Sequence, residues 1–427
     1  WAWPVFAQFQ PGTTNHFFAE GDTGASYLAY FPTSYDPSNP PPMMVYFDPA
    51  AWAEFGLEKL KPSCEAAGWV LVCPYVLNND NLFHTRRVES EVLWDARRRI
   101  PHNRSRVYLA GLSGGAWRAN RIAHELPGEF AGVLSFGGWI GWYDEINRFP
   151  DRLAVCTVNG VGDPSKVQQE PVDEWYYTQT LVRVRHVYWH GGHDIAPPGT
   201  VDVALAWFDA DYAATGSTFV SALAPALATN AYLQATSAVA SGQYTVAATN
   251  AVEILWRHPE SGLTRGADEL VVALFGSNTI RSQIALTNPP ADAAGISHAL
   301  MQRGLHYQEG FPREWGRAFH EAALEFNPAN ARAMAELARV LLGDAEWRHT
   351  EWARASALLA AALQLSPTNF YVKEQAARYE AEYGGLERAL AYGRAARSNY
   401  LASIHAQLGG YTWPLYYLDR DINSYRS

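Results

Sequence analysis

The sequence predicts an α/β protein followed by an all-helical region. Short apolar runs alternate with helix-length segments up to residue 212, which is typical of a mostly parallel sheet covered by helices on both faces. Beyond about residue 215 the strand-like runs end, alanine becomes dense and helical periodicity dominates. We therefore expect a sheet domain over residues 1–215 and a helical-repeat domain over residues 216–427 with an aromatic tail.

Composition and charge narrow the class of protein. The 427 residues suffice for two domains, and a content of 48% hydrophobic and 18% charged residues is a globular balance. The net charge of −10, without any Lys/Arg-rich run, argues against nucleic acid or an anionic membrane as partner. No apolar run approaches the ~18 residues that a membrane span needs. Because the chain begins at Trp1 rather than Met, a removed secretory signal fits as well as a trimmed fragment does, and we expect a secreted or periplasmic protein.

The three cysteines are Cys64, Cys73 and Cys156, which lie in apolar or helical segments. An odd count without C-x-x-C spacing argues against a disulfide framework and against a zinc site. We expect three free, buried thiols.

The predicted elements follow one another in strand–helix order. Strands are expected over 27–31, 43–47, 69–74, 107–110, 132–136, 153–158 and 185–189, and helices over 52–67, 88–100, 116–124, 171–183 and 201–212. The continuous apolar run Met43–Phe47 predicts a strand that is buried on both faces. Pro62 predicts a break or a new start within the helix over 52–67.

The segment Gly111-Leu112-Ser113-Gly114-Gly115 has the pattern G-x-S-x-G between a strand and a helix. Such a turn strains the serine backbone and exposes its hydroxyl at the carboxyl edge of the sheet, where α/β proteins form their active sites. Glycines on either side allow strand and helix to approach closely. We expect Ser113 to be a nucleophile.

A nucleophilic serine needs a base and an acid that orients the base. His193 lies in a glycine-containing loop after the last strand and is the expected base, while His190 is an alternative that a buried structural role would also explain. Asp163 follows a late strand between serine and base in chain order, and is the expected acid. Asp144, Glu145 and Asp173 compete for this role. A metal site at His190, His193 and Asp194 lacks further ligands and is disfavoured.

The developing oxyanion needs N–H donors. Gly114, which follows the nucleophile, should supply one, and the loop after Met43–Phe47 should supply the other. In that loop Pro49 has no N–H, so Ala50 is the expected donor. Asp48 would place negative charge near the site or cap the following helix.

Aromatic residues crowd the expected mouth of the site, at Trp52, Trp117, Trp139, Trp142 and Tyr143. They suit a cleft for an aromatic, sugar or polyester substrate, although most tryptophans in globular proteins belong to the core. Trp52, Trp139 and Trp142 are the expected substrate contacts.

Three segments of the second half end alike, at His258-Pro259, Asn327-Pro328 and Ser366-Pro367. Their spacing is close to multiples of a helical repeat of ~34 residues. Residues 222–397 thus resemble a degenerate tetratricopeptide-type array, which implies a concave surface for a protein or peptide partner.

The segments Tyr27–Pro37, Asp95–Arg99, Arg106–Gly115 and Gly191–His193 resemble the α/β-hydrolase superfamily. The similarity is greatest to its polyhydroxybutyrate-depolymerase-like and feruloyl or acetyl-xylan esterases, and it spans residues 20–212. It implies Ser113, His193 and Asp163 as a triad and no cofactor. Asp48-Pro49 departs from the His-Gly that many such hydrolases carry.

We therefore expect a serine carboxylic-ester hydrolase that acts on a small or polymeric ester through an acyl-enzyme. One alternative is a serine peptidase of the same fold. Another is a binding protein whose hydrolase domain is inactive and whose repeats hold a partner.

Overall fold

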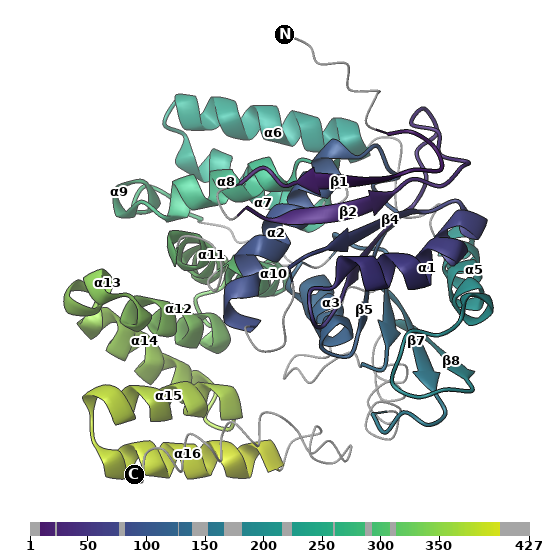
Figure 1. The fold of residues 1–427 in the computed structure, drawn as a ribbon. Helices are drawn as coiled ribbons and strands as arrows, with labels where there is room; N and C mark the ends of the chain where they lie inside the picture. The colour runs from purple at the N-terminus through teal and green to yellow at the C-terminus, as the bar shows by residue number, and fades with distance from the viewer. Residues whose placement is uncertain are drawn as a thin grey trace. The chain divides into compact units, whose positions relative to one another are not determined.

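The computed structural model describes residues 9–21, 24–76, 82–126, 128–138, 153–165, 182–215, 224–258, 261–286, 293–307 and 313–401 (Figure 1). The chain divides into two compact units. The sheet, the helices up to Ser241 and residues 249–269 belong to the first unit, whereas residues 242–248 and the chain from Leu270 onward belong to the second.

The described strands form one eight-stranded sheet in the order β1-β2-β4-β3-β5-β6-β7-β8. They are β1 (Thr14–Phe18), β2 (Ser26–Tyr30), β3 (Met43–Phe47), β4 (Val70–Pro74), β5 (Val107–Leu112), β6 (Gly132–Phe136), β7 (Ala154–Gly160) and β8 (Arg183–Trp189). The strands from β4 to β8 are parallel, while β1 pairs antiparallel with β2, and β2 with β4. The predicted mostly parallel α/β sheet is therefore confirmed.

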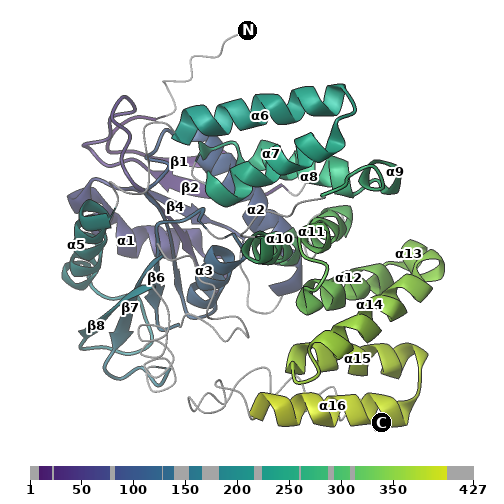
Figure 2. The same ribbon diagram turned by 180° about the vertical axis from the view of Figure 1, so that it is seen from behind.

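Helices cover both faces of this sheet (Figures 1 and 2). One core joins the sheet to α2 (Leu82–Arg99) and α3 (Gly114–Glu125), and a second core joins it to α1 (Ala53–Ala67) and α5 (Pro198–Thr215). Since side chains alternate along a strand, β3 contributes Met43, Val45 and Phe47 to the first core and its other two residues to the second.

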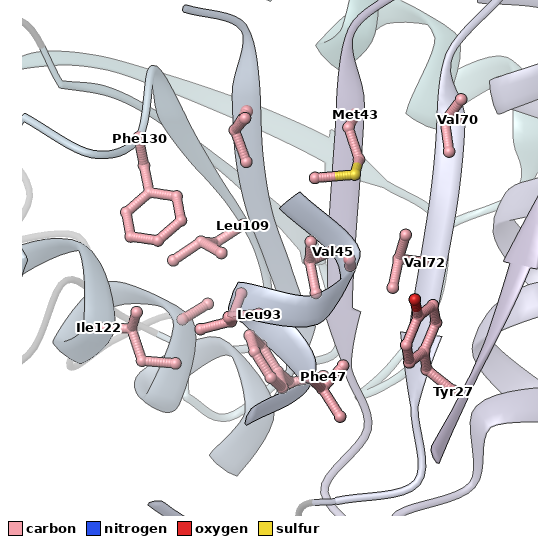
Figure 3. Close-up of a cluster of buried hydrophobic side chains, with 14 of the residues drawn as sticks. Tyr27, Met43, Val45, Phe47, Val70, Val72, Leu93, Leu109, Ile122 and Phe130 are labelled. Atoms are coloured by element: carbon pink, nitrogen blue, oxygen red, sulfur yellow. The ribbon is translucent and has the colours of Figure 1, made fainter. Parts of the chain in front are cut away.

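Figure 3 shows the first of these cores, in which Val45 and Phe47 pack beside Leu109 of β5 and Ile122 of α3. All four side chains are fully buried. Burial of each such side chain contributes roughly 1.5–3 kcal/mol. This layer therefore holds α3 firmly against β3 and β5, and Ser113 lies between β5 and α3.

One helix and one strand differ from what the sequence predicted. The helix α1 continues through Pro62 without a break, and buried Leu60 and Cys64 on either side anchor it in the second core. Strand β1 was not expected, because Thr14–Phe18 is a half-exposed edge strand whose apolar pattern is weak.

The first unit also includes α6 (Ala224–Ala240), the greater part of α7 (Tyr244–Arg257) and the start of α8 (Thr264–Phe275). The Arg104 guanidinium donates to the Ser261 carbonyl at 2.9 Å, and the Thr264 hydroxyl lies 3.5 Å from a carboxylate oxygen of Glu129. These contacts tie the segment before α8 to the sheet-bearing unit. Of the predicted helix over 171–183, residues 171–181 lie outside the described residues, whereas Arg183 is the first residue of β8 and not the end of a helix.

The described part of the second unit is helical. Its helices are the start of α7, the end of α8, α9 (Asn278–Arg281), α10 (Ala293–Tyr307), α11 (Arg313–Phe326), α12 (Ala331–Gly343), α13 (Ala345–Thr350), α14 (Trp352–Leu365), α15 (Phe370–Tyr383) and α16 (Leu386–Leu401). Extensive contacts pair α10 with α11, α12 with α14, and α15 with α16, and α12 also touches α10 and α15. The all-helical second half is confirmed, whereas its assignment to tetratricopeptide repeats stays a prediction. None of the described helices is long and apolar enough to cross a membrane.

Candidate active site

Ser113 is the single residue between the end of β5 and the start of α3. Its backbone has φ 54° and ψ −119°, a conformation that costs a non-glycine residue of order 1–3 kcal/mol. The Ser113 N–H donates to the Phe136 carbonyl at 2.8 Å, and its own carbonyl accepts from Trp117 N–H at 3.0 Å. Hydrogen bonds to β6 and to α3 thus hold the strained residue in place.

The two glycines of the motif lie where backbone segments nearly touch. A Cβ on Gly111 would lie 2.2 Å from the carbonyl carbon of Gly115, and a Cβ on Gly115 would lie 2.0 Å from the Phe47 oxygen. Neither position has room for a side chain. The motif therefore packs β3, β5 and α3 together at the carboxyl edge of the sheet.

Asp163 and His193 come from the loops after β7 and β8 and form a pair. His193 Nδ1 lies 2.9 Å from Asp163 Oδ2. Because an ionised carboxylate only accepts, the Nδ1 atom carries the proton and the Nε2 atom is left as the basic nitrogen. Asp163 is buried and His193 is exposed, so the pair presents its imidazole to the surface.

Ser165 is a second hydrogen-bond partner of Asp163. The other carboxylate oxygen, Oδ1, accepts from the Ser165 N–H at 2.9 Å and from the Ser165 hydroxyl at 2.6 Å. Burial alone would raise the pKa of Asp163, but the Ser165 and His193 hydrogen bonds outweigh it and lower the pKa below its usual value. Ser165 was not anticipated from the sequence, although Asp163-Pro164-Ser165 is typical of a turn in which the aspartate accepts from the residue two positions on.

The pair and the serine lie on either side of one short turn, Gly137-Gly138, which follows β6. A Cβ on Gly137, whose φ is 53°, would lie 2.6 Å from Asp163 Oδ2 and 2.7 Å from His193 Nδ1. A Cβ on Gly138 would lie 2.8 Å from the Ser113 carbonyl oxygen. The Asp163–His193 pair and the main chain of Ser113 thus lie against two adjacent glycines, whose role at the site was not anticipated from the sequence.

His190 is placed differently. Its side chain is exposed at the end of β8, so the buried structural role considered for it is wrong. The contact to Asp163 is made by His193. Asp144, Glu145 and Asp173 lie outside the described residues.

The loop between β3 and α1 differs from expectation. The Ala50 N–H donates to Asp48 Oδ1 at 2.8 Å, so the group expected to bind the oxyanion already has an acceptor. The Trp52 N–H lies 3.2 Å from the same oxygen. Asp48 therefore caps the loop that precedes α1 rather than the first turn of the helix itself. The Gly114 N–H belongs to the first turn of α3. N–H groups in a first turn have no acceptor within their own helix, and they form the positive end of the helix dipole.

Trp52 is the described member of the predicted substrate contacts. Its side chain is 59% exposed and stacks on Phe55, with ring centroids 5.5 Å apart. It follows the Asp48 loop directly and offers an apolar face to solvent near the carboxyl edge. Trp139 and Trp142 lie outside the described residues.

No protein-family model matches the sequence, and no curated protein does. Similar solved structures include the fluorophosphonate-binding serine hydrolase FphF of Staphylococcus aureus, which is 14% identical with a TM-score of 0.37 over 46% of this chain and 98% of its own. A ferulic acid esterase is 16% identical with a TM-score of 0.38 over 48% and 99% of the two chains. An esterase of Pyrobaculum calidifontis is 13% identical with a TM-score of 0.38 over 48% and 87%. At this level of similarity the geometry, and not the likeness, carries the functional argument.

Proposed function

We propose that this protein is a serine hydrolase that cleaves carboxylic esters through an acyl-enzyme, with Ser113 as nucleophile, His193 as base and Asp163 as the acid that orients it. The observation that carries the proposal is the 2.9 Å contact between His193 and Asp163 beside a serine with φ 54°. A strained serine at a strand–helix turn next to an oriented imidazole is the arrangement that makes a hydroxyl nucleophilic.

The expected reaction has two halves. His193 Nε2 takes the proton of the Ser113 hydroxyl as its oxygen attacks the ester carbonyl, and the tetrahedral intermediate collapses when His193 returns that proton to the leaving alcohol. Water then attacks the acyl-enzyme with the same base, releasing the acid and restoring the serine. Asp163 stays ionised and keeps the Nδ1 proton in place, which its lowered pKa favours.

Substrate recognition is proposed for the aromatic residues at the carboxyl edge. Exposed Trp52 offers a flat apolar face that suits an acyl chain or a ring. Trp139 and Trp142 remain candidates from the sequence alone, and the Gly114 N–H is the proposed donor to the oxyanion.

The test is covalent labelling and ester hydrolysis. Wild-type protein should react with a fluorophosphonate probe and hydrolyse p-nitrophenyl acetate, butyrate or octanoate. Ser113→Ala should lose the label and lower kcat by about 10³-fold or more, because the nucleophile is missing. Exposed Ser38, which lies in the turn before β3, provides the matched control Ser38→Ala and should leave both readouts unchanged.

Two other outcomes would favour the alternative functions. If folded wild type takes no label and cleaves no ester, the hydrolase proposal is wrong and the inactive, partner-binding alternative gains support. Cleavage of peptide p-nitroanilides in place of esters, again dependent on Ser113, would favour the peptidase alternative.

A further inference from the structure

Asp48 stands in the loop that should help to stabilise the oxyanion, yet it carries negative charge. The last residue of β3, Phe47, pairs with Gly111 of β5, so Asp48 lies one strand away from the nucleophile turn at the same end of the sheet. Neighbouring strands are about 4.8 Å apart. The side chain is 4% exposed.

The contacts of Asp48 are those of an ionised carboxylate held by neutral donors. Oδ1 accepts from the N–H groups of Ala50 and Trp52, and Oδ2 accepts from the Tyr46 hydroxyl at 3.2 Å. Burial and then the nearby Asp48 charge raise the pKa of Tyr46, which keeps that hydroxyl protonated as a donor. Every partner of the carboxylate is thus an uncharged group.

No Lys, Arg or His neutralises Asp48 within the part of the chain that the structure describes. The neighbouring acid, Asp194, differs in this respect, because Lys59 Nζ lies 3.4 Å from its Oδ2 atom. A buried carboxylate without a counter-ion is costly, since hydrogen bonds alone replace its water. A positive charge on a bound molecule would supply the missing partner.

The loop holds this carboxylate rigidly. Ala51 has φ 59°, an uncommon conformation for alanine, and its N–H donates to the Asp48 carbonyl at 3.2 Å. The side chain and the main chain of Asp48 thus both bind the loop that follows. The charge therefore keeps a fixed position relative to the nucleophile turn.

We propose that Asp48 is a specificity-determining residue that selects esters with a cationic group, such as a quaternary ammonium, close to the scissile bond. This inference rests on the proposed serine-hydrolase function. The fixed negative charge attracts such a group. It also opposes the oxyanion that any ester develops, because the second N–H donor of the site is engaged at Ala50. Only a cationic ester gains an attraction that offsets this opposition, so the charge favours cationic over neutral substrates.

The experiment compares matched thioesters in wild type and in Asp48→Asn, an isosteric change that keeps an acceptor for Ala50 and Trp52 and removes the charge. One pair is acetylthiocholine and 3,3-dimethylbutyl thioacetate. The other pair is the S-ethyl thioesters of betaine and of 3,3-dimethylbutanoate, which carry the same two groups on the acyl side. Taking the ratio of kcat/KM between wild type and variant cancels the intrinsic reactivities of the esters.

We expect the preference for the cationic member of at least one pair to fall about ten-fold or more in Asp48→Asn, with faster turnover of the neutral member. An unchanged preference in both pairs overturns the inference. If Asp48→Asn does not fold, wild type alone decides: tetramethylammonium should inhibit neutral-ester hydrolysis more strongly than an equal concentration of sodium ion, and equal effects reject the inference.

Ser113→Ala separates this inference from the proposed function. A fall in kcat of about 10³-fold or more in Ser113→Ala, together with an unchanged cation preference in Asp48→Asn, leaves the hydrolase proposal standing and removes only the role of Asp48. Hydrolysis by Ser113→Ala at the wild-type rate, or no hydrolysis by wild type, removes both.

Discussion

Ser113 holds a backbone conformation that its own side chain disfavours, and its neighbours supply the stabilisation. The cost of order 1–3 kcal/mol is offset by hydrogen bonds to Phe136 and Trp117 and by the close contact of Gly115 with Phe47. The strain is therefore maintained by packing at the ends of β3, β5 and β6.

This dependence on close packing can be tested at Gly115. A methyl group there would meet the Phe47 backbone oxygen at 2.0 Å, and neither segment can move without disturbing the sheet. Gly115→Ala should lower the free energy of unfolding by about 2–3 kcal/mol and abolish ester hydrolysis, measured by urea unfolding and p-nitrophenyl acetate turnover. Gly199→Ala, where the added Cβ meets nothing within 4 Å, is the control. Equal effects of the two changes would contradict the packing argument.

Ser165 offers a second test at the scale of one side chain. Its hydroxyl lies 2.6 Å from Asp163 Oδ1 and helps to lower the pKa of that carboxyl. Ser165→Ala should raise this pKa, so Asp163 would protonate at higher pH and the acid limb of the pH–kcat profile should move upward. We expect kcat to fall about ten-fold with little change in KM, since only the orientation of the base is weakened. Ser165→Thr should restore the profile, and a profile unmoved by Ser165→Ala would exclude the positioning role.

At the scale of elements, the buried strands were the most predictable part of the fold. The continuous apolar run Met43–Phe47 is β3 residue for residue, and Gly132–Phe136 is β6, because strands covered on both faces are mostly apolar along their whole length. Edge strand β1 was missed, and helix α1 was predicted but with a break at Pro62 that does not occur. Their stability comes from tertiary packing that local propensity does not record.

The candidate site was likewise predictable only where local sequence determines it. G-x-S-x-G and the chain order of acid and base follow from local sequence, so Ser113, Asp163 and His193 could be proposed from it. The engagement of Ala50 by Asp48 and the Gly137-Gly138 turn could not, because they depend on how loops after separate strands meet.

Helix caps in the second unit give an element-scale prediction. The Asn369 side chain at the start of α15 accepts from the N–H groups of Tyr371 and Val372 at 3.0 and 3.1 Å. Asn369→Ala should cost about 1 kcal/mol of unfolding free energy, and Asn369→Ser should recover most of it, since serine is also a good N-cap. The neighbouring exposed residue gives the control Thr368→Ala. Urea unfolding followed by circular dichroism would measure all three, and an Asn369→Ala value equal to that of Thr368→Ala would refute the capping role.

At the scale of the whole molecule, apolar cores and buried ion pairs stabilise each of the two units internally. The first has two large apolar cores on the faces of its sheet. In the second unit, a buried ion-pair network adds to the apolar core around α12. Glu336 is fully buried on α12, where Arg339 Nε lies 3.1 Å and Arg332 Nε 3.3 Å from its oxygens. The Tyr371 hydroxyl of α15 donates to it at 2.6 Å, which joins two helical hairpins.

This network predicts acid sensitivity of the second unit. Burial alone would raise the pKa of Glu336, but the two arginines outweigh it and lower the pKa to about 2. Because the folded pKa is below the unfolded value of about 4.5, the stabilisation is complete above about pH 4.5 and is lost as the pH falls toward about 2.

Glu336→Gln tests the assignment. It should lower the unfolding free energy by about 3 kcal/mol at pH 7, because two buried guanidinium groups lose their counter-charge, and the difference from wild type should vanish near pH 2. Glu387→Gln, at an exposed position of α16, should show neither effect. Urea unfolding at pH 7, 5 and 3 would decide, and a difference that stays constant across this range would contradict the assigned pKa.

Composition changes near residue 215, yet contacts such as that of Arg104 with Ser261 decide which of the later helices cluster with the sheet. Such long-range contacts leave no local signal in the sequence.

The three cysteines, all confirmed as free and buried, give the molecule a built-in probe. Cys64, Cys73 and Cys156 all belong to the sheet-bearing unit, and burial raises the pKa of each thiol. A maleimide can therefore reach them only when that unit opens, and the sequence from Leu270 onward contains no thiol to confuse the signal. The rate of thiol alkylation in the unmodified protein would thus report the opening of one unit alone, without any engineered label.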